Sequence, residues 1–217
     1  MILHLLRELS RPSFRENVFV EEKTILLHVC CAPDATVPWV ELQEEGYSVV
    51  PYWYGSNIHP PDEEQRRREA FGILAARMNS GVLREPYAPE AWLREAFPLA
   101  GEPEGGVRCA LCFFLQLESA ARRACEEGIP LLCTTLTISP HKDALLINKI
   151  GAECAARYGI TWLDRVFRKR NGFVRSVALS KEFGLYRQSY CGCIYSMTRG
   201  GNVNGKAGRG EAFPVST

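Results

Sequence analysis

The chain has 217 residues, of which 46% are hydrophobic and 24% are charged, a composition typical of a globular protein. These values exclude a collagen-like, coiled-coil or globally disordered chain. The 26 basic and 25 acidic side chains give a formal net charge of +1, so binding to any polyanion would require a local basic patch. Nine cysteines are the unusual feature of the composition.

The N-terminal segment lacks the apolar stretch and the small-residue cleavage site of a secretory signal. No later run is long and apolar enough to span a membrane. We therefore expect a cytoplasmic protein with no membrane contact. In that reducing compartment, clustered cysteines more often bind metal or perform redox chemistry than form disulfides.

The first half of the chain alternates predicted strands and helices. The β-branched, apolar run 24–29 leads directly into a cysteine pair and predicts a buried parallel strand. Asp62 is expected to cap a charged helix. In chain order, we expect a strand at 24–29, a helix at 36–45, a strand at 47–54, a helix at about 63–78, a brief strand at 82–85 and a helix at 88–97.

The second half continues this alternation and then changes character. A Gly/Pro-rich loop precedes a helix that ends near residue 127; a strand at 129–137, a helix at 144–158 capped by residues 139–143, and a short strand at 161–164 follow. The pattern predicts an α/β fold: a three-layer, Rossmann-like (HUP-type) parallel sheet flanked by helices, with a basic C-terminal extension. We expect one metalloenzyme domain over 1–200 and a Gly-rich tail over 201–217.

Six of the nine cysteines fall into three close pairs: Cys30 with Cys31, Cys109 with Cys112, and Cys191 with Cys193. A C-x-x-C pair leading into a helix allows two thiolates to converge on one metal. Six thiolates exceed one tetrahedral site, which indicates a second metal, a redox-active dithiol or partial use. Asp34 stands beside the first pair and adds a carboxylate, a ligand suited to a harder metal.

The other three cysteines, Cys125, Cys133 and Cys154, are expected to be small buried core residues. His28 lies within the first predicted strand and is expected to be a core histidine. A single thioredoxin-like dithiol would leave two of the three cysteine pairs unexplained, so the pairs together favour metal binding.

Several motifs, in order, resemble the QueH family of epoxyqueuosine reductases. They are LLHVCCAPD, VPYWYGSNIHPPDEEQRRRE, RCALCF, TTLTISPHKD and YCGCIYS, and they extend from about residue 25 to residue 196. The resemblance implies an oxidoreductase that reduces the epoxide of epoxyqueuosine to queuosine at the wobble nucleoside of tRNA. It also implies a 4Fe-4S cluster beside a mononuclear iron, with an external electron donor. The six paired cysteines and Asp34 match this inventory, but their spacing leaves open which pair serves which metal.

Epoxide reduction needs electrons, a polarised C–O bond and a proton. Asp34, His59 and His141 are the candidate catalytic residues because they stand near a cysteine pair or in turns after predicted strands. Histidines in such loops are equally often structural. For substrate binding we expect contributions from Tyr52, Tyr54, Asn57, Lys142, Arg168, Arg170 and Arg175. Alternation along the strand places Tyr52 and Tyr54 opposite Trp53, so these three aromatic side chains cannot all line one pocket.

The segment 165–187 is rich in arginine and lysine, with phenylalanine and tyrosine interleaved. Such a segment can pair with phosphates and stack on unpaired bases, so we expect it to contact the anticodon stem-loop of tRNA. A solvated face with aromatic core residues would have the same composition. Arg66, Arg67 and Arg68 form either a second basic patch or ordinary ion pairs with the nearby glutamates.

Two other functions fit parts of the sequence. A tRNA-thiolation-like enzyme would share the strand–helix alternation and the cysteine pairs, but no glycine-rich phosphate loop follows the first predicted strand. A zinc-stabilised RNA-binding module without catalysis would use the cysteines structurally. Bound iron with acid-labile sulfide favours the reductase, whereas stoichiometric zinc favours the module.

Overall fold

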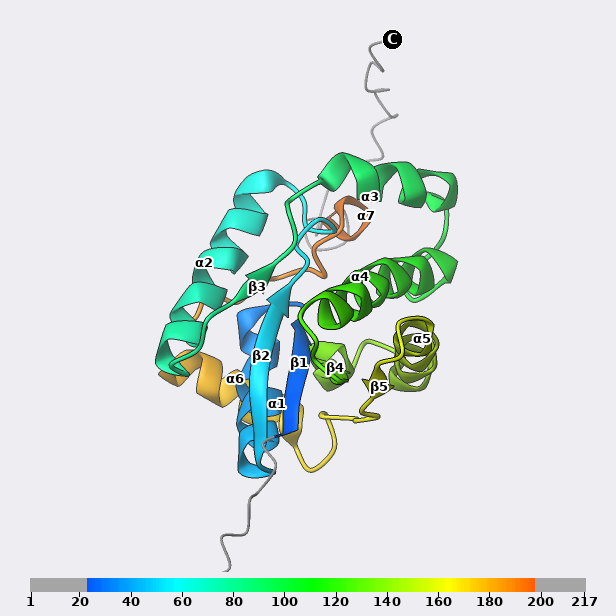
Figure 1. Ribbon diagram of the computed structural model, residues 1–217. Coiled ribbons are helices and arrows are strands. Elements are labelled where there is room, and N and C mark those ends of the chain that lie inside the picture. Colours follow the sequence, from blue (N-terminus) through cyan, green and yellow to red (C-terminus); the bar gives the residue numbers. More distant parts are fainter. Residues whose placement is uncertain (1–22, 198–217) are drawn as a thin grey trace, which may run out of the picture.

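A computed structural model describes residues 23–197, in which five parallel strands form one sheet of order β3-β2-β1-β4-β5 (Figure 1). β1 pairs with β2 on one side and with β4 on the other, so β1 is the central strand. The long apolar run before Cys30 therefore occupies the most buried position of the sheet, as such runs do in parallel sheets. The strands are β1 (Lys23–Val29), β2 (Tyr47–Trp53), β3 (Leu83–Arg84), β4 (Leu131–Thr134) and β5 (Thr161–Trp162).

Helices cover both faces of the sheet. The core on one face involves α1, α2 and α6, and the core on the other involves α4 and α5 (Figure 1). The short helices α3 and α7 lie beyond the carboxyl ends of the strands. The helices are α1 (Ala32–Glu44), α2 (Pro61–Arg77), α3 (Pro89–Ala96), α4 (Val107–Glu126), α5 (Ala144–Arg157), α6 (Gly172–Glu182) and α7 (Ile194–Met197), with 3₁₀ turns at Phe97–Leu99 and Thr135–Ile138.

This strand order confirms the predicted three-layer α/β fold and is consistent with a Rossmann-like fold. The chain leaves β1 toward β2 and later returns to place β4 on the other side of β1. The connections after β1 and β4 therefore diverge, and ligands of such sheets bind in the crevice at this point, outside the carboxyl ends of the strands. The first cysteine pair and the segment after β4 both lie there.

Several predicted element boundaries were wrong for local reasons. α1 begins at Ala32, four residues earlier than predicted, because Pro33 is accommodated in its first turn. α2 begins after Pro60, and Asp62 lies within its first turn instead of capping it. There its charge still complements the helix dipole. The strand predicted over 129–137 is shorter, and its second half forms a 3₁₀ turn. The capping role expected of residues 139–143 is confirmed, since Asp143 accepts from the N–H groups of Leu145 and Leu146.

The predicted basic extension is part of the folded body. It contains the helix α6, which was not predicted, and its Phe167 and Leu185 are buried in the core beside α1. The Ser176 hydroxyl donates to the carbonyl oxygen of Pro33 at 2.8 Å, which joins α6 to the first turn of α1. The predicted tail 201–217 and the first 22 residues of the predicted 1–200 domain lie outside the described residues. Among residues 23–197, none of the helices combines the length and apolar character required to cross a membrane.

Gly151 allows α5 to approach the edge strand β5 closely. A Cβ atom at this position would lie 2.3 Å from the Trp162 ring. We expect Gly151→Ala to lower the free energy of unfolding by about 1–3 kcal/mol, the usual cost of overpacking. Gly72→Ala, in α2, is the matched control because its Cβ would meet nothing within 4 Å. It should leave stability unchanged or raise it by up to about 1 kcal/mol. Urea denaturation measures both, and equal stability of the two variants would contradict the packing argument.

Candidate metal centre

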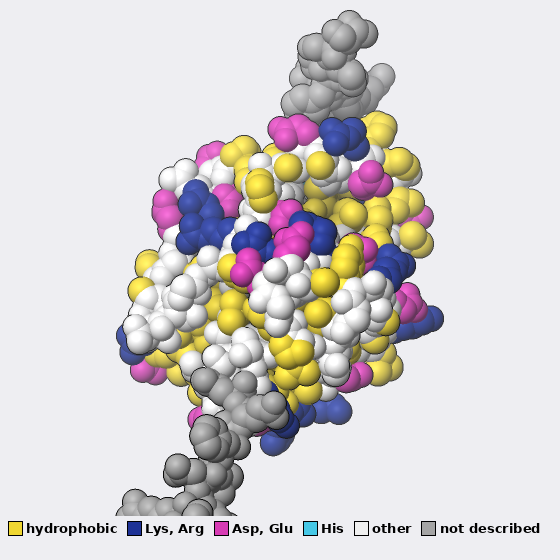
Figure 2. All heavy atoms as spheres, in the orientation of Figure 1, with side chains coloured by type: hydrophobic (Ala, Val, Ile, Leu, Met, Phe, Trp, Pro, Cys, Tyr) yellow, Lys and Arg dark blue, Asp and Glu magenta, His cyan; other side chains and the backbone are white. Residues whose placement is uncertain are grey.

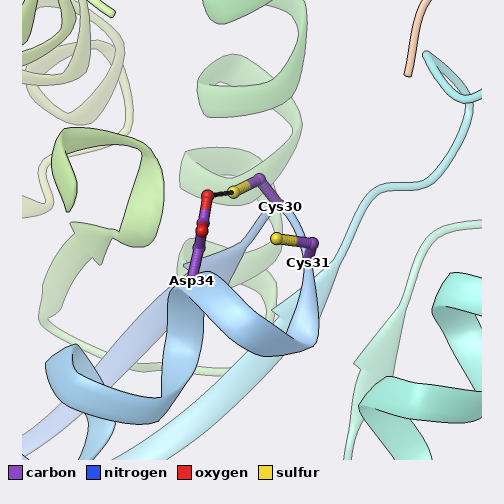
Figure 3. Close-up of side chains that lie close together, drawn as sticks. All are labelled: Cys30, Cys31 and Asp34. Atoms are coloured by element: carbon purple, nitrogen blue, oxygen red, sulfur yellow. Dashed lines mark hydrogen bonds between the residues drawn. The ribbon is translucent and has the colours of Figure 1, made fainter. Parts of the chain in front are cut away.

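Cys30, Cys31 and Asp34 converge where β1 ends and α1 begins (Figure 3). One ligand atom from each residue lies within 4.8 Å of the others. Cys31 is the N-cap residue of α1, and Asp34 lies in the first turn, so the strand–helix junction itself directs all three side chains to one point. Cys31 and Asp34 are buried and Cys30 is partly exposed, which leaves the group open on one side.

Hydrogen bonds fix the sulfur atoms of this group. Cys30 Sγ lies 3.6 Å from Asp34 Oδ2 and 3.3 Å from the Thr135 hydroxyl, which also accepts from the Cys30 N–H at 3.2 Å. The Gln188 side-chain amide donates to Cys31 Sγ at 2.9 Å. Thr135 follows β4 and Gln188 follows α6, so the two sulfurs are held by segments far away in the sequence.

The other four paired cysteines come from two further segments. Cys109 and Cys112 lie in the first turns of α4, while Cys191 and Cys193 flank Gly192 in the loop before α7. The Gly105 N–H donates to Cys109 Sγ at 3.2 Å. The Gln116 amide donates to Cys112 Sγ at 3.2 Å and to the Cys112 carbonyl oxygen at 3.0 Å. Because a carbonyl oxygen requires a donor, this second contact fixes the orientation of the Gln116 amide.

One cavity of about 580 Å³ joins these segments. Its volume falls within the range usual for sites that hold a small-molecule group. Five of the six paired cysteines line it, all except Cys193, which is buried beside Cys112 and Trp92. The cavity lies at the carboxyl edge of the sheet, as predicted for a parallel α/β fold. Other lining residues that bear on function are Asp34, Asn57, His141, Lys142, Phe173 and Arg187.

The pKa values of the paired cysteines show that burial opposes ionisation of most of these thiols. Burial, together with the charges of Cys191 and Cys193, raises the pKa of Cys112. Burial also raises the pKa of Cys191 to about 11, against the opposing effect of Lys142. The pKa of Cys30 is lowered by a hydrogen bond from Cys31 and by the charge of Lys142, whereas burial raises the pKa of Cys31. Thiols that resist ionisation through burial and mutual repulsion are the groups that a bound cation stabilises as thiolates.

The donor set therefore fits a thiolate-bound metal centre. Cys112 packs in one cluster with Cys193, and Cys109, Cys112 and Cys191 line the same cavity, so these four cysteines are gathered in one region. Soft sulfur ligands suit iron–sulfur clusters and zinc, while the carboxylate of Asp34 adds a harder ligand to the first group. N–H donors to three of the sulfurs, those of Cys31, Cys109 and Cys112, supply the outer contacts that orient metal ligands.

The structure separates the two candidate catalytic histidines. His141 is exposed and lines the cavity. His59 is buried, with its ring 5.3 Å from that of Trp92, and it does not line the cavity. Its Nε2 atom has no hydrogen-bond partner within residues 23–197. The backbone N–H of His59 donates to the Gly192 carbonyl oxygen at 2.8 Å, so His59 contacts the site through its main chain.

The expected substrate-binding residues are also divided. Asn57 and Lys142 line the cavity. Tyr52 is buried in the sheet core and its hydroxyl bonds to Ser119 at 2.7 Å, away from the cavity lining. Tyr54 is half-buried, and the pKa of its phenol is raised by burial and by the charge of Cys112. Tyr52 and Tyr54 do pack on the face opposite Trp53, as strand alternation predicted.

Two of the predicted basic residues, Arg168 and Arg175, have hydrogen-bond or ion-pair partners within the fold. Arg168 donates to the carbonyl oxygens of Ser139 and Lys142, at 3.1 and 2.7 Å, and so supports the loop that carries His141. Arg170 and Arg175 line a separate hollow with three glutamates of the α1 C-terminal region, and Arg175 pairs with Glu41 at 2.8 Å. On the face drawn in Figure 2, basic and acidic side chains are interspersed. The basic groups that do line the large cavity are Arg67, Lys142 and Arg187, with Phe173 beside Arg187.

Sequence reasoning missed the residues that hold the sulfurs, namely Thr135, Gln116 and Gln188. The only signal for Thr135 was its place near the carboxyl end of the strand predicted over 129–137, at the edge of the sheet where the site was expected. The two glutamines carry no pattern that marks them. Cys133 and Cys154 are buried as expected, but the prediction for Cys125 was wrong because this residue lies on the exposed face of α4. His28 is a buried core histidine, bonded to Thr134 at 2.9 Å, and burial lowers its pKa to about 3.

A parallel sheet of this order, with thiols and a carboxylate gathered outside its central strand, defines a Rossmann-like α/β protein with a candidate metal centre. Comparison with known proteins identifies the family. The family model described as "Epoxyqueuosine reductase QueH" matches residues 25–199. The chain belongs to the QueH family.

Individual relatives agree with this assignment. A protein of Streptococcus pyogenes serotype M1 named epoxyqueuosine reductase QueH is 38% identical over 198 residues, which cover 88% of this chain and 76% of the relative. The protein of the same name from Thermotoga maritima is 34% identical, with 80% and 90% covered. That of Dehalococcoides mccartyi is 36% identical, with 79% and 91% covered.

Proposed function

We propose that this chain reduces the epoxide of epoxyqueuosine in tRNA to the alkene of queuosine, at the cavity where its paired cysteines meet. The chain is an oxidoreductase of the epoxyqueuosine reductase class. The observation that carries the placement of the reaction is the convergence of five paired cysteines and Asp34 on one cavity at the carboxyl edge of the sheet. The net reaction takes two electrons and two protons and releases the epoxide oxygen as water.

We assign the cysteines to two centres. Cys30, Cys31 and Asp34 would hold a mononuclear iron, because their ligand atoms lie within 4.8 Å of one another. Cys109, Cys112, Cys191 and Cys193 would hold a 4Fe-4S cluster, because Cys112 packs in one cluster with Cys193 and lines the same cavity as Cys109 and Cys191. When bound, these centres supply electrons from an external donor and a Lewis-acidic position for the epoxide oxygen.

The remaining residues of the cavity bind and protonate the substrate. His141 lines the cavity and is exposed to solvent. It is therefore placed to donate a proton to the departing oxygen and to take up another proton from water. Lys142 and Asn57 offer hydrogen bonds to the substrate hydroxyls. Burial lowers the pKa of Lys142, but the charges of Cys30, Cys191 and Asp34 outweigh this effect and raise it, so the ammonium stays charged and balances the thiolates.

We place tRNA recognition at the rim of the cavity, and not along the whole basic segment 165–187. Arg187 and Phe173 face the cavity as a stacked cation–π pair, 5.6 Å from the guanidinium carbon to the ring centroid. Such a pair can contact a phosphate and stack on a base extruded from the anticodon loop. Arg170 and Arg175 remain candidate phosphate contacts further from the cavity, next to the acidic end of α1.

Anaerobic turnover of epoxyqueuosine-containing tRNA tests this function. Protein reconstituted with iron and sulfide, and supplied with a chemical reductant, should convert epoxyqueuosine to queuosine, detected by mass spectrometry of the digested tRNA. Colourless protein with stoichiometric zinc and no conversion would instead indicate an RNA-binding module. Fully loaded protein that leaves the epoxide intact would refute the proposed activity.

Gln188 should influence the reaction although it lies outside the ligand set. Gln188→Leu removes the amide N–H that donates to Cys31 Sγ at 2.9 Å. Since outer contacts of this kind typically contribute 10–100-fold to metal affinity or activity, we expect a loss of about that size in conversion rate. Gln65→Leu is the matched control, because Gln65 is exposed on α2 and, among residues 23–197, its side chain bonds only to Glu69. Equal rates for the two variants would show that the contact has no effect.

A further inference from the structure

Arg67 and Glu63 form a charged pair inside the protein. Their side chains are 2% and 1% exposed, and Arg67 Nε donates to Glu63 Oε1 at 2.8 Å. Both residues lie on α2, one turn apart. A buried pair of this kind is costly to desolvate, so it is retained only where its further hydrogen bonds are satisfied. The two terminal nitrogens of the Arg67 guanidinium must therefore have hydrogen-bond partners as well.

The two terminal nitrogens of Arg67 bind the backbone of the cysteine loop. Nη1 donates to the carbonyl oxygen of Cys191 at 2.9 Å, and Nη2 donates to that of Tyr190 at 3.1 Å. The guanidinium also lies over the Tyr190 ring, 5.1 Å from its centroid. All three nitrogens of the group are therefore used, one toward α2 and two toward the loop. This planar fork spans two carbonyls in a way that a lysine ammonium does not.

Gly192 explains why the loop can approach so closely. Its φ is +128°, in a region that favours glycine. A Cβ atom there would lie 2.9 Å from Arg67 Nη1. The Gly192 carbonyl oxygen accepts from the His59 N–H at 2.8 Å. The consecutive carbonyl groups of residues 190–192 are thus bound by Arg67 of α2 and by the His59 N–H in the turn before α2.

From these contacts we propose that Arg67 is a positioning residue for the QueH reaction. It fixes the main chain of residues 190–192 so that Cys191 and Cys193 face Cys109 and Cys112 before any metal binds, and Glu63 orients the guanidinium. This inference rests on the proposed assignment of those four cysteines to one centre. It gives the buried ion pair of α2 a role in building the site, 124 residues away in the chain from the loop it holds.

Arg67→Lys and Arg66→Lys form a matched pair of variants. Arg66 pairs with the same Glu63, at 2.8 Å, but its side chain is 57% exposed. Metal-free, reduced, full-length protein is titrated with Cd²⁺, and the thiolate-to-cadmium absorption is followed. We expect Arg67→Lys to bind Cd²⁺ about 10–100-fold more weakly at the four-cysteine set and Arg66→Lys to match the wild type. After reconstitution, Arg67→Lys should also show an altered EPR spectrum and reduction potential.

A second variant tests the proposal if Arg67→Lys fails to fold. Gly192→Ala leaves Arg67 and Glu63 in place but forces the loop away from the guanidinium, and it should produce the same weakened Cd²⁺ binding. Folded Arg67→Lys or Gly192→Ala protein with wild-type Cd²⁺ affinity, EPR spectrum and potential would overturn the proposal. Wild-type protein that takes up no iron–sulfur cluster would instead overturn the assignment of the cysteines.

Discussion

Cys30→Ala protein is expected to lose epoxide reduction by more than about 100-fold while still taking up an iron–sulfur cluster. The loss should exceed the 10–100-fold typical of outer contacts because a direct ligand is removed. Cys30 Sγ lies 3.6 Å from Asp34 Oδ2, and the three candidate ligand atoms of this group lie within 4.8 Å of one another, so Cys31 and Asp34 alone would not complete the proposed iron site. The four cysteines from α4 and from the loop before α7 are untouched.

Two measurements check this expectation. Anaerobic turnover gives the rate of conversion, and iron and acid-labile sulfide analysis gives the metal content. Sulfide should remain at about four per chain, the content of one 4Fe-4S cluster, while iron falls by about one. Cys154→Ala is the control, because Cys154 is buried against the sheet core and lies outside the cavity. Wild-type iron content and activity in Cys30→Ala protein would remove this residue from the site.

Cys112→Ser should have the complementary effect. Cys112 lines the cavity, and its Sγ accepts a hydrogen bond from the Gln116 amide at 3.2 Å. Burial and the charges of the neighbouring cysteines Cys191, Cys193 and Cys109 raise its pKa. A serine oxygen keeps the approximate size of the side chain but is a poor ligand for the soft sites of an iron–sulfur cluster. We expect loss of the brown colour and of most acid-labile sulfide, with conversion at background.

The control for this variant is Cys125→Ser, on the same helix. Cys125 is exposed and lies outside the cavity, so the same chemical change there should leave colour, sulfide and turnover at wild-type levels. The two variants should differ in their content of acid-labile sulfide: Cys30→Ala protein keeps it and Cys112→Ser protein loses it. The reverse pattern would show that the two cysteine groups have exchanged roles.

The sequence predicted those features of the fold that depend on local pattern. The apolar run before Cys30 and the strand–helix alternation were sufficient to predict the parallel three-layer sheet. The cavity lies at the carboxyl edge of that sheet, where the sequence placed its candidate site. α6 was missed because its basic and aromatic composition resembles that of an extended nucleic-acid-binding segment. Its Phe173 packs partly against the core and also lines the cavity together with Arg187, just beyond the helix, whereas Phe167 is buried in the core, and composition does not distinguish these positions.

The residues that surround the sulfurs were beyond prediction because they come from elsewhere in the chain. Thr135 contacts Cys30 across 105 residues, and Gln188 contacts Cys31 across 157. Only the order of the strands brings these segments together, and sequence spacing does not encode it. His59 illustrates the converse: a histidine in a suggestive motif serves the site through its backbone, while its ring packs on Trp92.

The order of the segments along the chain has a consequence for how the holoenzyme matures. The last strand, β5, ends at Trp162, whereas Cys191 and Cys193 come almost thirty residues later. During synthesis all five strands of the sheet, together with Cys30, Cys31, Cys109 and Cys112, therefore emerge from the ribosome before the final two thiols do. Under the proposed assignment of the cysteines, insertion of the full metal complement is then a late event. The nascent chain at that stage holds four of the six proposed cysteine ligands and lacks the last two.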